Sequence, residues 1–401
     1  MGILKVLRAM VPHQDDRVAT PMAAGTSNAL ENTKAIKSLS YYLGSAMTGI
    51  CEVPAYAWYS HNIKGDRVEG YHRYAVVMLI DQGKDTFEGA TGDDWISGSQ
   101  SMRAYMRGGE VAGLMASHIR NLGHAARPQT NVDSDVIHNP LLILAGLAEQ
   151  SRIGESTLNP FIGPRFKSVI LTTDMPLVID KPIDYGLQYF CTHCYKCARE
   201  CPCNAIPFKD KVMFNGYETW KPDSERCTRY RFTNMKGSAC GRCVKVCPLN
   251  KDTTLGGPLH VQIGSWLGVN AMWLKPLLVP FSVWLDDKLG NGNPNPDKKW
   301  WLDLEIVDGI SVEPVKGTNT KKIKPGIDIA KKKLNEKIAY YPASVLPPPG
   351  SLEPFPVDRK AAVAMTDQIE TPDQALERRR LGKAMPAHYK SPWDNKKPRS
   401  D

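Results

Sequence analysis

Residues 191–202 read Cys191-Thr-His-Cys194-Tyr-Lys-Cys197-Ala-Arg-Glu-Cys201-Pro202, which is the pattern C-x2-C-x2-C-x3-C-P. Residues 240–248 repeat its last part as Cys240-Gly-Arg-Cys243-Val-Lys-Val-Cys247-Pro248, and Gly237 stands where another cysteine would complete the repeat. Nine of the ten cysteines lie within residues 191–247. Such clustering is typical of metal or redox chemistry, whereas the disulfides of secreted proteins are scattered along the chain.

The first run has the cysteine spacing of bacterial ferredoxins, in which three thiolates bind one four-iron cluster and the fourth binds a second cluster. Cys227 is the nearest upstream cysteine that could complete the truncated second run. Crossed ligation then predicts two [4Fe-4S] clusters. We expect the first to be bound by Cys191, Cys194, Cys197 and Cys247, and the second by Cys201, Cys227, Cys240 and Cys243.

Structural zinc and a set of disulfides are the weaker interpretations of this region, because neither explains two C-x3-C-P endings. Cys51 and Cys203 are left over, and we expect both to be plain buried cysteines without a role.

The 401 residues of the chain suffice for two or three domains with a large hydrophobic core. A composition of 42% hydrophobic and 23% charged residues predicts a globular chain. Most of the net charge of +9 comes from eight lysines within residues 316–337. We interpret this run as a solvated surface, with docking of an anionic partner as the alternative.

The N-terminal sequence MGILKVLRAMVPHQDD shows neither a long apolar segment nor a twin-arginine pair, so no export leader is expected. The apolar stretch at residues 269–285 is interrupted by Lys275, Pro276 and Pro280 and is too short for a confident membrane span. We therefore expect a cytoplasmic protein, or a peripheral membrane protein if a leader has been removed.

Before the cysteines, the apolar periodicity predicts an α+β domain. Helices are expected at residues 33–43, 99–122 and 141–150, and strands at residues 47–53, 75–80 and 167–173. Asn32 is the expected cap of the first helix, and Gly108-Gly109 the expected kink in the second. Residues 154–164 read as a loop, and the wholly apolar strand at residues 75–80 should be interior to its sheet.

Residues 257–310 contain five tryptophans that we expect to be in the core: Trp266, Trp273, Trp284, Trp300 and Trp301. A proline-rich linker at residues 342–356 and a short helix around residues 374–385 follow. Neither a Walker A motif nor G-x-G-x-x-G occurs, so a nucleotide cofactor is not expected and electrons must come from a separate protein.

Several short motifs together resemble one family, the corrinoid- and iron-sulfur-dependent reductive dehalogenases. They are the sequence AGLAEQSRIG at residues 145–154, Asn159-Pro160, Gly163-Pro164-Arg165, TTDMPL at residues 172–177, Phe190-Cys191, the truncated second cysteine run, and DDKLG at residues 286–290 ahead of Trp300-Trp301. The resemblance covers about residues 34–305, and the combination of motifs is more specific than any single one.

The resemblance implies an α+β fold, in which a nitroreductase-like domain binds a corrinoid and an inserted or following ferredoxin-like module passes electrons to its cobalt. The implied boundaries are an N-terminal arm at residues 1–33, the corrinoid domain at 34–185, the two-cluster module at 186–256, a tryptophan-bearing segment completing the corrinoid and substrate domain at 257–310, and a C-terminal extension at 311–401. None of the nine histidines lies in a D-x-H-x-x-G motif, so a base-off corrinoid is implied.

The family replaces a carbon–halogen bond by carbon–hydrogen and uses a tyrosine as proton donor, supported by a basic residue about sixty positions later. The resemblance assigns these roles to Tyr105 and Arg165, with Asn131 as a polar residue of the pocket. A phenol is a weak acid at neutral pH, and a nearby guanidinium would stabilise the phenolate left behind. His138 and His193 receive no assignment.

The expected partners are an external ferredoxin or flavodoxin and a small organohalide, with a halogenated aromatic favoured over a haloalkene. No nucleic acid is expected, and a homodimer or peripheral membrane association is compatible with the sequence. Two alternatives stay open. An epoxyqueuosine reductase acting on tRNA would share the corrinoid and clusters but carry helical repeats, and a non-enzymatic electron-transfer subunit would leave the residues before Cys191 without a purpose.

Overall fold

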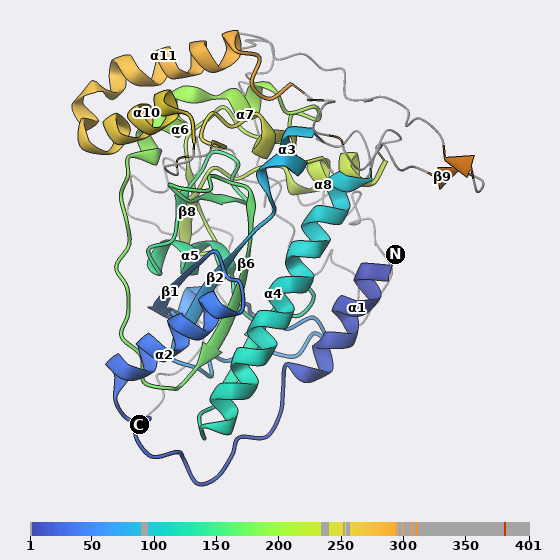
Figure 1. Ribbon diagram of the computed structural model, residues 1–401, viewed down its shortest axis with the longest axis vertical. Helices are drawn as coiled ribbons and strands as arrows, with labels where there is room; N and C mark the ends of the chain where they lie inside the picture. Colours follow the sequence, from blue (N-terminus) through green and yellow to red (C-terminus); the bar gives the residue numbers. More distant parts are fainter. Residues whose placement is uncertain are drawn as a thin grey trace.

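The computed structural model describes residues 2–89, 95–233, 240–251, 253, 257–293, 295, 299, 306–307, 310–311 and 381. At its centre is an antiparallel sheet with the strand order β1-β2-β6-β3 (Figure 1). These strands are β1 (Met47–Glu52), β2 (Tyr74–Asp81), β6 (Phe166–Thr173) and β3 (Ala126–Gln129). The three strands expected from the sequence are confirmed, and β3 adds a fourth.

Both faces of the sheet are covered, which explains why β2 is apolar throughout its middle. Val76 and its even-numbered neighbours pack against α4 (Ile96–Asn121) and α2 (Ala29–Tyr42). Val77 and its odd-numbered neighbours pack on the other face against α5 (His138–Leu144). The interior position expected for this strand is therefore confirmed.

Helix α4 is continuous through Gly108 and Gly109, so the glycine pair does not end or divide it. A Cβ at position 108 would lie 3.0 Å from the Cβ of Val169 on β6. Glycine therefore lets the helix approach the sheet closely, which gives Gly108 a packing role. The kink expected at this pair stays a prediction.

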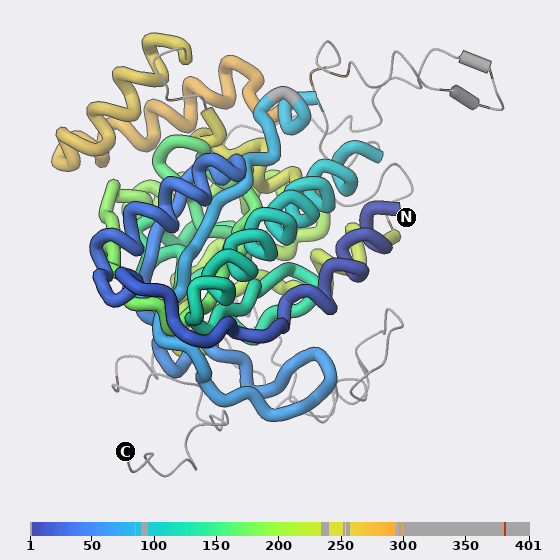
Figure 2. Tube along the Cα trace, turned by 60° about the horizontal axis from the view of Figure 1, so that its bottom comes forward, coloured from blue at the N-terminus to red at the C-terminus, as the bar shows by residue number. Residues whose placement is uncertain are grey.

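Helix α1 (Gly2–Met10) runs beside α4, as Figures 1 and 2 both show. Leu7 is buried in this contact, and the buried Arg120 guanidinium of α4 donates hydrogen bonds to the carbonyl oxygens of Gln14 and Ala126 at 3.1 and 2.9 Å. The first residues of the chain are thus packed onto the sheet layer.

Two helix boundaries differ from expectation. Helix α2 is capped by Asn28 rather than Asn32, because the Asn28 side chain accepts hydrogen bonds from two amides of the first turn. Asn32 is buried instead and donates to the carbonyl oxygens of Thr26 and Pro176 at 2.8 and 3.0 Å. A four-residue offset in the cap follows from having two asparagines one helical turn apart.

Helix α5 ends at Leu144 instead of continuing to residue 150. Gly146 has φ +69°, and a Cβ there would lie 2.3 Å from the carbonyl oxygen of Lys181, so the chain leaves the helix through a position that requires glycine. The next residues form β4 (Glu149–Gln150), which pairs with β5 (Thr157–Leu158) inside the expected loop.

The cysteine-rich module lies at one end of the sheet layer (Figure 1). Its elements are α6 (Leu187–Cys194), α7 (Lys196–Arg199), the hairpin β7 (Val212–Phe214) and β8 (Tyr217–Thr219), α8 (Ser224–Thr233) and α9 (Arg242–Lys245). It is followed by α10 (Leu259–Asn270) and α11 (Lys275–Lys288), of which α11 packs on α6. The remaining described elements are α3 (Lys84–Gly89), β9 (Ile306–Val307), β10 (Ile310–Ser311) and the short 3-10 turns at Val11–His13, Ala55–Ala57 and Met272–Leu274.

The tryptophans of α10, of α11 and of the turn between them are not in the core. Trp266, Trp273 and Trp284 are 63%, 79% and 53% exposed, because α11 buries only a narrow face on its neighbours and α10 buries none of its residues. The expectation of core tryptophans is wrong for these three. Within the described part of the chain, every helix is too short or too polar to cross a bilayer.

Other expectations fall outside the described residues and stay predictions. They are Trp300 and Trp301, the lysine run at residues 316–337, the proline-rich linker and the helix around residues 374–385.

Candidate active site and cysteine groups

The eight predicted cluster ligands gather into two groups. Four of them line a single cavity: Cys191, Cys194, Cys197 and Cys247. In the other group, Cys227 and Cys243 pack against a small core that contains Cys201, and burial together with Cys240, Cys227 and Cys201 raises the pKa of the Cys243 thiol. The two sets match the crossed pattern expected from the sequence, in which each run lends one cysteine to the other run's cluster.

A left-handed residue shapes the first group. Tyr195 has φ +56° between α6 and α7, and this reversal brings Cys194 and Cys197 to the same cavity. Cys191 lies one turn earlier on α6. Short helical segments joined by a tight reversal are what allow thiols three residues apart to converge.

The buried thiols favour their protonated form until a metal binds. Burial raises the pKa of Cys191 to about 12 and that of Cys194 to about 11. Burial and the neighbouring thiols raise the pKa of Cys197 well above its usual range. Iron binds the thiolate form of cysteine. Binding of iron would therefore supply the free energy needed to deprotonate thiols that burial keeps protonated.

The donor chemistry fits a cluster better than a single ion. Within the residues described, no three His, Cys, Asp or Glu side chains converge closely enough to share one metal ion. A four-iron cluster is a wider body whose thiolates bind at separate corners. Two groups of four buried or partly buried thiols are the donor set that two such clusters require.

Cys51 and Cys203 differ from one another. Cys51 is buried, and burial raises its pKa to about 12, as suits a cysteine that only packs. Cys203 is only half-buried, and its Sγ lies 3.7 Å from the Sγ of Cys201. The expectation of a plain buried cysteine is therefore wrong for Cys203.

Arg152 explains part of the AGLAEQSRIG motif, because its buried guanidinium joins the sheet layer to the cysteine module. Its Nε donates to the carbonyl oxygen of Cys191 at 2.7 Å, and its Nη1 donates to the carbonyl oxygen of Pro207 at 3.0 Å. The guanidinium carbon also lies 4.3 and 5.0 Å from the ring centres of Tyr195 and Trp220.

The DDKLG motif has a similar role. The fully buried Lys196 of α7 forms ion pairs with Asp286 and Asp287 of α11, and Arg199 donates to Asp287 at 2.7 and 2.8 Å. These carboxylates hold α7, which carries Cys197, against α11.

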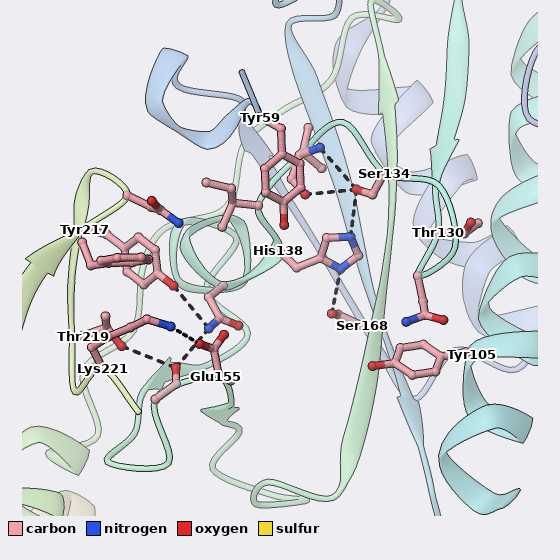
Figure 3. Close-up of a pocket in the computed structure, with 17 residues that line it drawn as sticks. Tyr59, Tyr105, Thr130, Ser134, His138, Glu155, Ser168, Tyr217, Thr219 and Lys221 are labelled. Atoms are coloured by element: carbon pink, nitrogen blue, oxygen red, sulfur yellow. Dashed lines mark hydrogen bonds and ion pairs between the residues drawn. The ribbon is translucent and has the colours of Figure 1, made fainter. Parts of the chain in front are cut away.

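A pocket of about 350 Å³ lies between the sheet layer and the β7–β8 hairpin of the cysteine module (Figure 3). Tyr105 and Asn131 both line it, as their predicted roles require. The Tyr105 hydroxyl points away from α4 into the space between the two layers (Figure 3). Other aromatic lining residues are Tyr59, Phe214 and Tyr217.

Arg165 lies outside this pocket. Its buried guanidinium bonds to Asp81 through Nε at 3.3 Å and to Asn250 through Nη1 at 3.4 Å. The basic group beside Tyr105 is instead Lys167, whose Nζ lies 4.9 Å from the centre of the tyrosine ring. Sequence reasoning missed Lys167, although it follows Tyr105 by 62 positions and Arg165 follows by 60.

His138 is a second pocket residue without a predicted role. Its Nδ1 lies 2.9 Å from the hydroxyl of Ser168 and its Nε2 lies 3.3 Å from that of Ser134 (Figure 3). Burial lowers the pKa of His138 to about 4, so the ring is neutral near pH 7. His193, by contrast, is exposed on α6 and stacks on Tyr189 at 4.2 Å.

The pocket also borders the second cysteine group. Glu155 lines the pocket and is paired with Lys221 at 2.6 Å. The neighbouring Cys203 thiol lowers the pKa of Cys227, while burial and, to a smaller extent, the Glu155 carboxylate oppose this shift. A pocket wall is therefore within electrostatic reach of a predicted cluster ligand.

An α+β layer joined to two groups of four thiols defines an iron-sulfur redox protein. Residues 190–251 match the family described as a 4Fe-4S dicluster domain. The solved structure "Catabolic reductive dehalogenase NpRdhA, N-terminally tagged" is 48% identical, with a TM-score of 0.80 over 95% of this chain and 54% of that chain.

The curated relatives agree. A tetrachloroethene reductive dehalogenase of Sulfurospirillum multivorans is 36% identical over 44% of this chain and 34% of the relative. One from Desulfitobacterium hafniense is 34% identical over 56% of this chain and 40% of the relative. The chain is similar to these solved and curated proteins, which are all named reductive dehalogenases. It spans about half the length of the solved relative and less of the curated ones.

Proposed function

We propose that this protein is a reductive dehalogenase whose organohalide substrate binds in the pocket between the sheet layer and the β7–β8 hairpin. The reaction takes two electrons and one proton, forms a carbon–hydrogen bond and releases halide. The observation that carries this proposal is a tyrosine hydroxyl directed into a pocket that borders the cysteine module, with a lysine ammonium beside its ring.

The proposed cofactors are two [4Fe-4S] clusters on the two cysteine groups and a base-off corrinoid in the pocket. A solved relative with 49% identity is described as performing B12-dependent dehalogenation. The polar lining, with Ser134, Asn139 and Ser168, suits the amide side chains of a corrinoid. When bound, the corrinoid would supply a strongly reducing cobalt for the carbon–halogen bond.

His138 supports the base-off assignment. Both of its ring nitrogens face serine hydroxyls, so neither is directed at a metal. This arrangement agrees with the missing D-x-H-x-x-G motif.

In this proposal, Tyr105 donates the proton and Lys167 stabilises the negative charge that remains on the phenolate. A cation about 5 Å from an aromatic ring in a low-dielectric pocket interacts strongly with such a charge. Asn131 would orient the substrate by hydrogen bonding. Arg165 stays a prediction for the supporting role, but its bonds to Asp81 and Asn250 favour a positioning role at the junction of the two layers.

We further propose a halogenated aromatic as substrate. The aromatic walls suit a planar ring, and Lys167 suits an ionised phenol. A solved relative was captured with 3-bromo-4-hydroxybenzoic acid, and it is 49% identical over 95% of this chain. A separate ferredoxin or flavodoxin would supply the electrons.

The tRNA-acting alternative is less well supported. The epoxyqueuosine reductase of Salmonella typhimurium is 25% identical over 38% of this chain. The electron-transfer alternative leaves the pocket of the sheet layer without a ligand.

The test is an anaerobic assay with reduced methyl viologen, a panel of halophenols and haloalkenes, and halide release as the readout. Tyr105→Phe should keep iron and corrinoid yet lose turnover by about 10²- to 10⁴-fold, as for a general acid. Lys167→Met should lose nearly as much, and the double variant should lose less than the product of the two because the pair acts as a unit.

Tyr59→Phe removes another pocket hydroxyl and serves as the matched control, which should change turnover only a few-fold. Undiminished turnover in Tyr105→Phe would refute the proton donor. Full turnover in Lys167→Met, together with its loss in a folded Arg165→Met variant, would return the supporting role to Arg165.

A further inference from the structure

Cys203 is a fifth thiol at the second cysteine group. Its Sγ lies 3.7 Å from that of Cys201, and Cys203 and Cys227 both pack against the small core that contains Cys201. It therefore lies beside two of the four predicted ligands of the second cluster. A thiol this close to a ligand is within a small side-chain rotation of an iron site that they would share.

The backbone that carries Cys203 is better anchored than that of Cys227. Cys203 follows Cys201 and Pro202 directly, and this loop packs in a small core that includes Ala205 and Ile206. Cys227 lies on α8, a helix without a fully buried residue. Fewer buried contacts make local opening of a segment less costly. Cys227 is thus carried by an element that buries none of its residues fully.

We propose that Cys203 is a reserve ligand of the second cluster, able to replace Cys227 on the same iron. In the exchange, the Cys203 thiol loses a proton and binds iron, while the Cys227 thiolate leaves and takes up a proton. The charge and oxidation state of the cluster are unchanged. The inference rests on the second cluster of the proposed function, and it concerns ligation rather than turnover.

The first experiment measures iron and sulfide after anaerobic reconstitution of the full chain, with EPR of the reduced and oxidised forms. Wild type should hold about eight irons. Cys227→Ala should also hold about eight, with a changed EPR signal from the second cluster. Cys203→Ala/Cys227→Ala should lose the fourth iron or the whole second cluster, while the first cluster reports that the chain is folded.

Cys51→Ala, in place of Cys203→Ala, is the matched control and should not alter loading in either background. Equal loss in Cys227→Ala and in the double variant would overturn the proposal, as would full loading of the double variant. A wild type limited to four irons would instead refute the second cluster itself, so the two failures are distinguishable.

A second experiment needs no double variant. Iodoacetamide labelling of the loaded protein, followed by peptide mass spectrometry, should modify Cys203 in wild type because this half-buried thiol is not bound to iron. In loaded Cys227→Ala, Cys203 should be protected by several-fold. Equal labelling of Cys203 in both proteins would overturn the exchange.

Discussion

At the scale of single residues, burial determines the protonation state of a titratable side chain. His138 lies in a polar pocket, yet the loss of solvent around its ring outweighs its two serine contacts and keeps it neutral. Lys167 lies partly exposed beside Tyr105, with its Nζ 4.9 Å from the centre of the ring. One pocket residue is therefore a neutral imidazole, and another, Tyr105, has a lysine beside its ring.

The lowered pKa of His138 predicts a pH-dependent stability. The His138 imidazole takes up a proton near pH 6.5 in the unfolded chain but only near pH 4 in the folded chain. The contribution of the neutral imidazole to folding stability is therefore complete above about pH 6.5 and is lost as the pH falls towards 4. The loss should reach at most about 3 kcal/mol.

The measurement is the anaerobic thermal midpoint of wild type and His138→Gln between pH 7 and pH 5. Their difference should shrink as the pH falls, since other acidic groups affect both proteins alike. His193→Gln changes an exposed histidine and should leave the pH profile unaltered. A constant difference between wild type and His138→Gln would contradict the assignment.

At the scale of elements, buried ion pairs fix how the cysteine module is assembled. Lys196 of α7 has no solvent exposure and depends on Asp286 and Asp287 of α11 for its charge balance. A buried pair contributes little net stability, but removing one partner leaves an uncompensated charge. Helix α11 is thus required for the placement of α7 and Cys197.

We predict that Asp286→Ala lowers the free energy of unfolding by about 3 kcal/mol and accelerates loss of the first cluster. Adding Lys196→Met should restore part of the stability, because it removes a buried cation that Asp287 alone would otherwise have to balance. Glu52→Ala breaks the exposed pair with Arg73 and should cost less than about 1 kcal/mol. Thermal melts measure the stability of these variants, and cluster absorbance measures the loss of the first cluster. If Asp286→Ala destabilised the protein no more than Glu52→Ala does, the role of α11 would be contradicted.

At the scale of the whole molecule, the cysteine module lies at one end of the sheet layer (Figure 1), and residues of both parts line the pocket. The apolar side chains of α10, of α11 and of the turn between them include the exposed Trp273 and Leu277. The expected homodimer or peripheral membrane association stays a prediction.

Cofactor loading is the prediction for the whole molecule. Protein produced anaerobically with corrinoid supplied should contain about eight irons and one cobalt per chain. The Co(II) EPR spectrum should lack the nitrogen splitting of a histidine ligand, because His138 is engaged by serines. Nitrogen splitting would contradict the base-off state, and absence of cobalt would refute the enzyme proposal.

The spacing of residues in the sequence was sufficient to predict contacts between residues that are close together in the chain. The cysteine runs predicted both thiol groups, because ligands three residues apart must share a site whatever surrounds them. The strands followed from apolar runs, since a sheet covered on both faces needs no alternation. The motifs around Arg152 and Asp286 were recognised in the sequence. Their contacts with the cysteine module could not be predicted from it.

Contacts between distant segments were decided only by the tertiary structure. Arg165 and Lys167 are equivalent by spacing from Tyr105, and only the packing of β6 against α4 places the ammonium beside the ring. Cys203 lies beside Cys201 and packs on the same small core as Cys227 of α8, and Trp284 is exposed because α11 buries a single narrow face. Sequence periodicity indicates which residues lie on the same face of a helix or strand. Which other element packs against that face depends on contacts between segments far apart in the chain.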